Sequence, residues 1–138
     1  MKKILLIILP LLLIVGCSKQ KEYSIDNIVE RESIYYKKFT EDIVNGFVFK
    51  EIKGTKIRLG RIRNGNKDGK WTIWFENGQK SSEGTFKDGK EDGLHIEWHS
   101  NGQKGLEGTY KDGKQIGKLT YYNFDGSIDD DWGDEDDW

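Results

Sequence analysis

Two adjacent blocks of 24 residues share one pattern, and this repeat constrains the fold more than any other feature of the chain. Residues 69–92 read GKWTIWFENGQKSSEGTFKDGKED and residues 93–116 read GLHIEWHSNGQKGLEGTYKDGKQI, with identity at 13 of 24 positions. A shorter third copy, GKLTYYNFDGS, occupies residues 117–127. A fixed step of this kind predicts a stack of similar structural units.

Glycines mark the repeat most regularly. The repeat glycines are Gly69, Gly78, Gly84, Gly93, Gly102, Gly108, Gly117 and Gly126. A weaker version of the pattern extends upstream, because Gly60 precedes Gly84 by the same step. We therefore expect the repeat to cover residues 34–127 as about three and a half copies. The leader over residues 18–33 allows either one helical turn or a strand.

Each copy contains two strand-like runs separated by turn signals. Asn77-Gly78 predicts a tight hairpin turn, because both residue types tolerate positive φ. Asp88-Gly89 is expected to mark a longer return turn. The chain contains no alanine and one proline, which excludes a helical bundle. The predicted fold is all-β: an elongated antiparallel meander of repeated hairpins, followed by a disordered acidic tail.

Aromatic residues recur in step with the glycines and predict what stabilises the sheet. Trp74, Trp98 and Tyr122 are 24 residues apart, and strand alternation places them on one face in every copy. Phe86 and Tyr110 each follow a glycine by two residues, so each ring shares a face with bare backbone. We expect these five residues to form an aromatic ladder, with each ring removing about 150–250 Å² from water.

The first 17 residues have the features of an export signal. Two lysines precede 12 residues, Ile4 to Val15, that are apolar apart from one proline. As a helix this run would be roughly 18 Å long, which is shorter than a bilayer core. The end of the segment resembles a bacterial lipobox, which implies that residues 1–16 are removed and that Cys17 is acylated. An ordinary cleaved signal with a chance cysteine is the alternative.

The repeat itself resembles a known family. The string G-K-W-T-x-W-x-x-N-G-Q-K-x-x-E-G-x-F/Y-K-D-G-K is similar to the variant MORN repeat of the bacterial YwqK-family antitoxin type. The resemblance covers roughly residues 29–127 and implies an elongated antiparallel sheet. It also suggests an antitoxin or immunity function, although a toxin in the cytosol would not require a lipoprotein signal on its antitoxin.

Residues that could carry chemistry are few. His95, Glu97 and His99 alternate along one predicted strand and could hold a divalent metal, but the other copies have no ligand at the matching positions. A half-exposed face with two chance histidines is the simpler interpretation. There is no nucleophile motif and no phosphate loop, so we expect no catalytic residue, metal or cofactor. An envelope enzyme that binds a cofactor through the histidines is a third, weaker alternative.

Charge is distributed unevenly along the chain. The last ten residues, DDDWGDEDDW, contain seven of the 24 acidic residues, and residues 17–128 carry 20 basic and 17 acidic residues. The segment 128–138 is expected to be a solubilising tail that discourages edge pairing. Alternatively, Trp132 and Trp138 anchor it to a basic surface. Nucleic acid is an unsuitable partner for a net-acidic exported chain.

These observations predict an envelope lipoprotein without enzymatic activity. Residues 1–16 would be its signal, residues 17–33 a linker, and the repeat sheet a protein-binding or scaffolding surface. The membrane, through the lipid anchor, and an unidentified protein are the expected partners. Ser18 follows Cys17 and is not an aspartate, which is similar to the outer-membrane cargo of enterobacterial lipoprotein sorting. The resemblance therefore implies the outer membrane as the location in a Gram-negative host.

Overall fold

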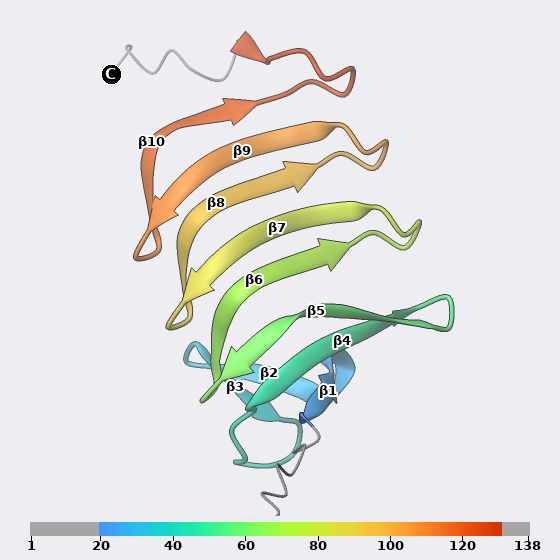
Figure 1. Ribbon diagram of the computed structural model, residues 1–138, viewed down its shortest axis with the longest axis vertical. Helices are drawn as coiled ribbons and strands as arrows, with labels where there is room; N and C mark the ends of the chain where they lie inside the picture. Colours follow the sequence, from blue (N-terminus) through green and yellow to red (C-terminus); the bar gives the residue numbers. More distant parts are fainter. Residues whose placement is uncertain (1–19, 131–138) are drawn as a thin grey trace, which may run out of the picture.

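The computed structural model describes residues 20–130, which form one long β-sheet with a small hairpin packed at one end (Figure 1). Eight strands lie side by side in the order β1-β4-β5-β6-β7-β8-β9-β10. From β4 to β10 neighbouring strands are antiparallel, whereas β1 pairs in parallel with β4. The predicted elongated meander of hairpins is confirmed. The strands are β1 (Glu22–Ser24), β4 (Gly46–Ile52), β5 (Thr55–Arg63), β6 (Asn66–Trp74), β7 (Lys80–Lys87), β8 (Lys90–Trp98), β9 (Lys104–Lys111) and β10 (Lys114–Tyr121).

The N-terminal part of the described chain is folded, whereas a linker was expected over residues 17–33. A 3-10 turn, η1 (Ile25–Asn27), leads into a two-stranded hairpin made of β2 (Ile28–Arg31) and β3 (Ile34–Lys37). Both alternatives for this segment, a helical turn and a strand, are therefore present in succession. Among the described strands β3 shares a sheet only with β2, so the meander begins at β4 rather than near residue 34.

The two kinds of turn are the reverse of what the sequence predicted. Asp88-Gly89 joins β7 to β8 as a two-residue turn, and both residues have positive φ, 50° and 81°. Asn77-Gly78 lies instead in the longer loop between β6 and β7, where only the glycine has positive φ. The asparagine side chain explains the difference, because its Oδ1 accepts a hydrogen bond from Gln79 N at 3.0 Å and forms an Asx turn.

Buried apolar side chains gather at one end of the sheet, beneath the β2–β3 hairpin. The buried cluster consists of Ile28, Val44, Val48, Leu59, Ile62 and Trp71. Within the described residues, β7 to β10 contribute no buried apolar side chain. The C-terminal strands are therefore stabilised by backbone pairing and by half-buried side chains, not by an enclosed core.

Candidate binding surface

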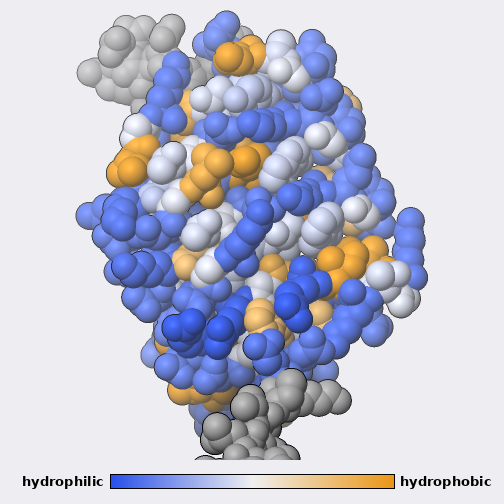
Figure 2. All heavy atoms as spheres, viewed as in Figure 1, coloured by the Kyte–Doolittle hydropathy of each residue, from blue (hydrophilic) through white to orange (hydrophobic). Residues whose placement is uncertain are grey.

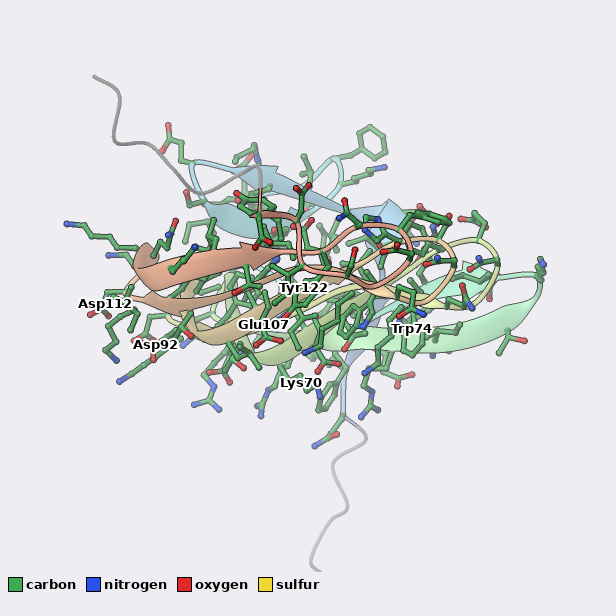
Figure 3. The ribbon with its side chains drawn as sticks, turned by 90° about the horizontal axis from the view of Figure 1, so that it is seen from above. Lys70, Trp74, Asp92, Glu107, Asp112 and Tyr122 are labelled. Carbon is green, nitrogen blue, oxygen red and sulfur yellow. The ribbon has the colours of Figure 1, made fainter. Side chains whose placement is uncertain are left out.

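The sheet has a covered and an uncovered face. We call the side beneath the β2–β3 hairpin the hairpin face and the opposite side the open face. Trp71 of β6 joins the core on the hairpin face, so its neighbours Lys70 and Thr72 point to the open face. Figure 3 shows Lys70 on the side of the sheet away from the hairpin. Over residues 20–130 no further layer of strands or helices covers the open face.

A row of buried glycines crosses the hairpin face, and a large side chain of the following strand covers each of them. The pairs are Gly60 with Trp71, Gly84 with His95 and Gly108 with Leu119. A Cβ atom at Gly60 would lie 2.5 Å from the indole ring of Trp71. The glycine row therefore leaves space for bulky neighbours, as expected, but the closest neighbour comes from the next strand rather than from the same strand.

The other six repeat glycines have a different role. All of them adopt positive φ, namely Gly69, Gly78, Gly93, Gly102, Gly117 and Gly126. Their backbone conformation is one that other residues adopt only with strain. The eight glycines predicted as one group are thus two groups, one required by packing and the other by backbone geometry.

The five aromatic residues expected as one ladder lie in two rows on opposite faces. Phe86 and Tyr110 lie on the hairpin face, with ring atoms 3.5 and 3.6 Å from the Cβ positions of the preceding repeat glycines. Trp74 and Trp98 lie on the open face, because each is an even number of residues from an open-face position of its own strand. Tyr122 follows β10 directly and lies two residues after Thr120, which pairs with Glu107 of the same face. Trp74 also packs against the buried cluster, so Trp98 and Tyr122 are the rings of this row that a partner could reach.

Two rings of the open-face row, Trp98 and Tyr122, each lie beneath a lysine that is also paired with a glutamate. The Lys80 ammonium lies 5.4 Å from the ring centroid of Trp98 and 2.8 Å from Glu83 Oε2. One copy later, Lys104 lies 5.9 Å from the ring centroid of Tyr122. These cation–π contacts fix the lysine stems along the rings and repeat with the step of the sheet.

Glu83 is the most extensively paired carboxylate on the open face. Lys70 and Lys80 lie 2.7 and 2.8 Å from its two oxygens, and the Thr72 hydroxyl donates to it at 3.3 Å. Burial alone would raise the pKa of Glu83, but the hydrogen bonds and charges of the two lysines outweigh it and hold the pKa below its usual value. Glu83 is therefore a structural anion that organises two strands.

The histidine pattern separates into two unrelated sites. His95 lies between two carboxylates: its Nε2 is 3.2 Å from Glu97 Oε1, and its Nδ1 is 2.8 Å from Glu91 Oε1 but not aligned for a hydrogen bond. His99 instead contacts the carbonyl oxygen of Tyr122 through Nε2 at 2.8 Å. No group of three His, Cys, Asp or Glu side chains between residues 20 and 130 is arranged to hold a metal ion.

A basic groove on the open face of β4 to β6 was not anticipated from the sequence. Its volume is about 440 Å³, and Phe47, Arg58, Arg61, Lys70 and Thr72 are among the residues that line it. The guanidinium carbons of Arg58 and Arg61 lie 4.0 and 5.7 Å from the ring centroid of Phe47. Figure 2 shows the most hydrophilic side chains of this face gathered over the same end of the sheet.

The charges of the groove are only partly compensated. The carboxylate of Asp68 pairs with Arg63 at 3.0 Å, and Glu22 approaches Arg58 at 3.6 Å. No carboxylate within the described chain forms an ion pair with Arg61. Chemically, the groove offers two planar guanidinium groups and an aromatic floor, which suits a carboxylate next to an apolar group.

A register shift explains why the groove was missed. Strict alternation along KIRLGRIR would place Arg58 and Arg61, three residues apart, on opposite faces. The shift between Val48 and Phe49 of β4 pairs Phe49 with Arg58 and leaves Arg61 opposite Phe47. Both arginines consequently reach the open face. The four basic residues of this strand were the only signal in the sequence, and the net charge of −2 conceals it.

Two predicted features lie outside the described residues, namely the acylation site Cys17 and the acidic segment from residue 131 onward. Between residues 20 and 130, no helix has the length and apolar character needed to cross a bilayer.

Comparison with known proteins returned no match, since no family model, no curated protein and no solved structure aligns with the chain significantly.

Proposed function

We propose that this protein is a lipid-anchored, non-enzymatic component of the bacterial cell envelope whose open face binds another protein. The observation that carries the proposal is the basic groove on β4 to β6, with Arg61 unpaired among the described residues and an aromatic floor. Arginine and aromatic side chains dominate the energetics of protein interfaces. An uncovered groove of this composition favours recognition over catalysis.

The chemistry of the groove defines the partner. Arg58 and Arg61 are suited to carboxylates, and the ring of Phe47 offers an apolar contact beside them. The lysine-covered rings of Trp98 and Tyr122 extend a similar combination of charge and aromatic surface along the sheet. We therefore propose a partner with an acidic surface that also carries exposed apolar side chains.

The position of the groove agrees with attachment at the N-terminus. Strand β1 begins at Glu22, five residues after Cys17, so an extended chain places it within about 18 Å of the anchor. Glu22 itself contacts Arg58 of the groove. An acyl group on Cys17 would consequently hold the groove close to the bilayer, where it would meet membrane-associated partners.

Crosslinked capture from the membrane fraction tests the binding surface. The variant Arg58→Glu/Arg61→Glu reverses the groove charge, and Lys87→Glu/Lys90→Glu, at the turn between β7 and β8, makes the same change in net charge elsewhere. We expect the groove variant to lose its crosslinked partner and the control to retain it. Equal capture by both variants would refute the proposed surface.

The identity of the captured protein distinguishes this function from the antitoxin or immunity role suggested by the repeat resemblance. A toxin that acts in the envelope, encoded by a neighbouring reading frame, would favour immunity. A structural envelope protein would favour scaffolding.

The anchor has a separate test. We expect the wild-type protein to sediment with membranes and Cys17→Ala to appear in the soluble fraction, because the acyl chains provide the attachment. Ser18→Ala is the matched control, since it leaves the acylated residue intact. Membrane association of Cys17→Ala equal to that of the wild type would refute lipidation at this position.

A further inference from the structure

The sheet ends at β10, and the structure contains the beginning of one more pairing beyond it. Among the described strands, β10 is last in the sheet order, so its outer edge has no strand partner. Residues further along the chain nevertheless approach this edge. Tyr122 forms an isolated antiparallel bridge with Ile128, and Asp129 N donates to Tyr121 O at 2.9 Å.

The loop that leads to this bridge, residues 123–127, has the same backbone hydrogen bonds as two earlier loops. In it, Asn123 N donates to Ser127 O at 2.8 Å and Gly126 N donates to Asn123 O at 2.9 Å. The loops over residues 75–79 and 99–103 make the same two backbone bonds with nearly the same lengths. Each of those loops delivers the chain into a full strand, first β7 and then β9. Ile128 lies 24 residues after Lys104, the first residue of β9, and so occupies the position at which a strand begins in the earlier copies.

A cavity lies where the next strand would run. Its volume is about 230 Å³, below the about 300–1,000 Å³ of typical small-molecule sites, so it suits a side chain rather than a separate ligand. The residues that line it come from the C-terminal half of β10 and from the segment after the loop: Lys118, Leu119, Thr120, Tyr121, Ile128, Asp129 and Asp130.

The register of the repeat indicates which residue would fill the cavity. Gly108 of β9 pairs with His95 of β8. The positions one repeat of 24 residues later are Trp132 and Leu119, so the same register would place Trp132 opposite Leu119. An inner strand needs glycine here because a large side chain of the following strand covers the position, as His95 covers Gly84 and Leu119 covers Gly108. Where no following strand covers this position, a tryptophan can replace the glycine.

Charge favours the same pairing. Lys114 and Lys118 are exposed on β10. The segment that follows the described residues, DWGDEDDW, contains five acidic residues and no basic one. Aspartate and glycine have low strand propensity, so pairing would depend on this attraction and on the tryptophan.

We propose that the outer edge of β10 is a strand-acceptor site whose occupant is the chain's own segment 131–135, with Trp132 packed against Leu119. This pairing adds one more strand to the meander and covers an edge that would otherwise be open to pairing with another chain. The inference does not depend on the lipid anchor or on the groove partner.

Hydrogen exchange of the full chain tests the proposal, with Trp132→Ala and Trp138→Ala as matched variants of one segment. We expect the amides of β10 to exchange at least tenfold faster in Trp132→Ala and in a chain that ends at Asp130, whereas Trp138→Ala behaves as the wild type. Exchange in β5 and β6 reports whether each variant is folded. Addition of the peptide DDDWGDEDDW to the shortened chain should restore protection, and high salt should weaken it.

Three outcomes would overturn the proposal. Unchanged exchange of β10 in the shortened chain would show that the segment does not occupy the edge. Equal effects of the two tryptophan substitutions would refute the register. Protection that disappears on dilution would identify a second copy of the chain as the occupant.

Discussion

Glycine at position 60 and glycine at position 108 occupy equivalent places in the repeat, yet their surroundings differ in rigidity. The Cβ position of Gly60 meets the indole ring of Trp71, which is held in the core and donates through Nε1 to Arg61 O at 3.0 Å. The Cβ position of Gly108 meets Leu119 Cδ2, the end of a flexible side chain near the edge of the sheet. The shorter distance, 2.2 Å at Gly108 against 2.5 Å at Gly60, is therefore the less serious obstacle.

This contrast predicts the effects of two identical substitutions. Gly60→Ala should reduce the free energy of unfolding by about 1–3 kcal/mol, because Trp71 cannot move without disrupting the core. Gly108→Ala should cost less than about 1 kcal/mol, because Leu119 can change rotamer. Urea unfolding of both variants measures the difference. A larger loss for Gly108→Ala would show that distance alone determines the cost.

The lowered pKa of Glu83 predicts how the free energy of unfolding depends on pH. Its pKa is lowered in the folded protein from an ordinary value of 4.5, so its stabilising effect is present above that pH and is lost as the pH falls through the folded pKa. Glu83→Gln should therefore cost about 1–2 kcal/mol at pH 7 and progressively less towards pH 3. Urea unfolding across this range checks the result. The exposed Glu51→Gln is the control, and a constant deficit of Glu83→Gln at all pH values would contradict the prediction.

At the scale of the element, the loops that follow β6, β8 and β10 are hydrogen-bonded to one another. Asn77 Nδ2 donates to Ser100 O at 3.1 Å, and Asn101 Nδ2 donates to the carbonyl oxygen of Phe124 one copy later. The same asparagines close the Asx turns of their own loops. Each asparagine therefore stabilises two successive copies, which gives a reason for its place in the repeat beyond turn formation.

The substitution Asn77→Ala should consequently affect more than its own loop. We expect a loss of about 1–2 kcal/mol in the free energy of unfolding, since hydrogen bonds to Gln79 N and Ser100 O both disappear. Faster hydrogen exchange should appear in the loops over residues 75–79 and 99–103 alike. Faster exchange confined to the first loop would show that the bond between copies contributes nothing.

The elements were predictable from the sequence only where they repeat. The step of 24 located β6 to β10, because every copy contributes the same glycines and rings. The β2–β3 hairpin has no such signal, since its place depends on contacts of Ile28 with residues of β4 to β6 that are distant in sequence. The basic groove depends on the register shift between β4 and β5, which brings Arg58 and Arg61 to one face and which alternation does not predict. Turn type was misjudged because the Asn77 side chain competes with the tight turn.

For the whole molecule, the distribution of the core along the sheet has a mechanical consequence. Every buried apolar side chain of residues 20–130 lies between Ile28 and Trp71, so the end nearest the proposed anchor is the most firmly packed. The C-terminal strands depend on that end, because each pairs in turn with a strand closer to it. In repeat proteins, stability is approximately a sum over units and their interfaces. Loss of the packed end should therefore propagate along the sheet.

Two isoleucines test this dependence, one in the β2–β3 hairpin at the packed end and one in β10 at the other end. Ile28→Ala removes a side chain that is 6% exposed and should cost about 2–4 kcal/mol, with faster hydrogen exchange from β4 through β10. Ile116→Ala removes one that is 49% exposed and should cost less than about 0.5 kcal/mol, with any faster exchange confined to β9 and β10. Urea unfolding and hydrogen exchange of both variants provide the comparison. If β8 to β10 kept wild-type protection in Ile28→Ala, the repeats would be stable on their own and the N-terminal core would serve only its own strands.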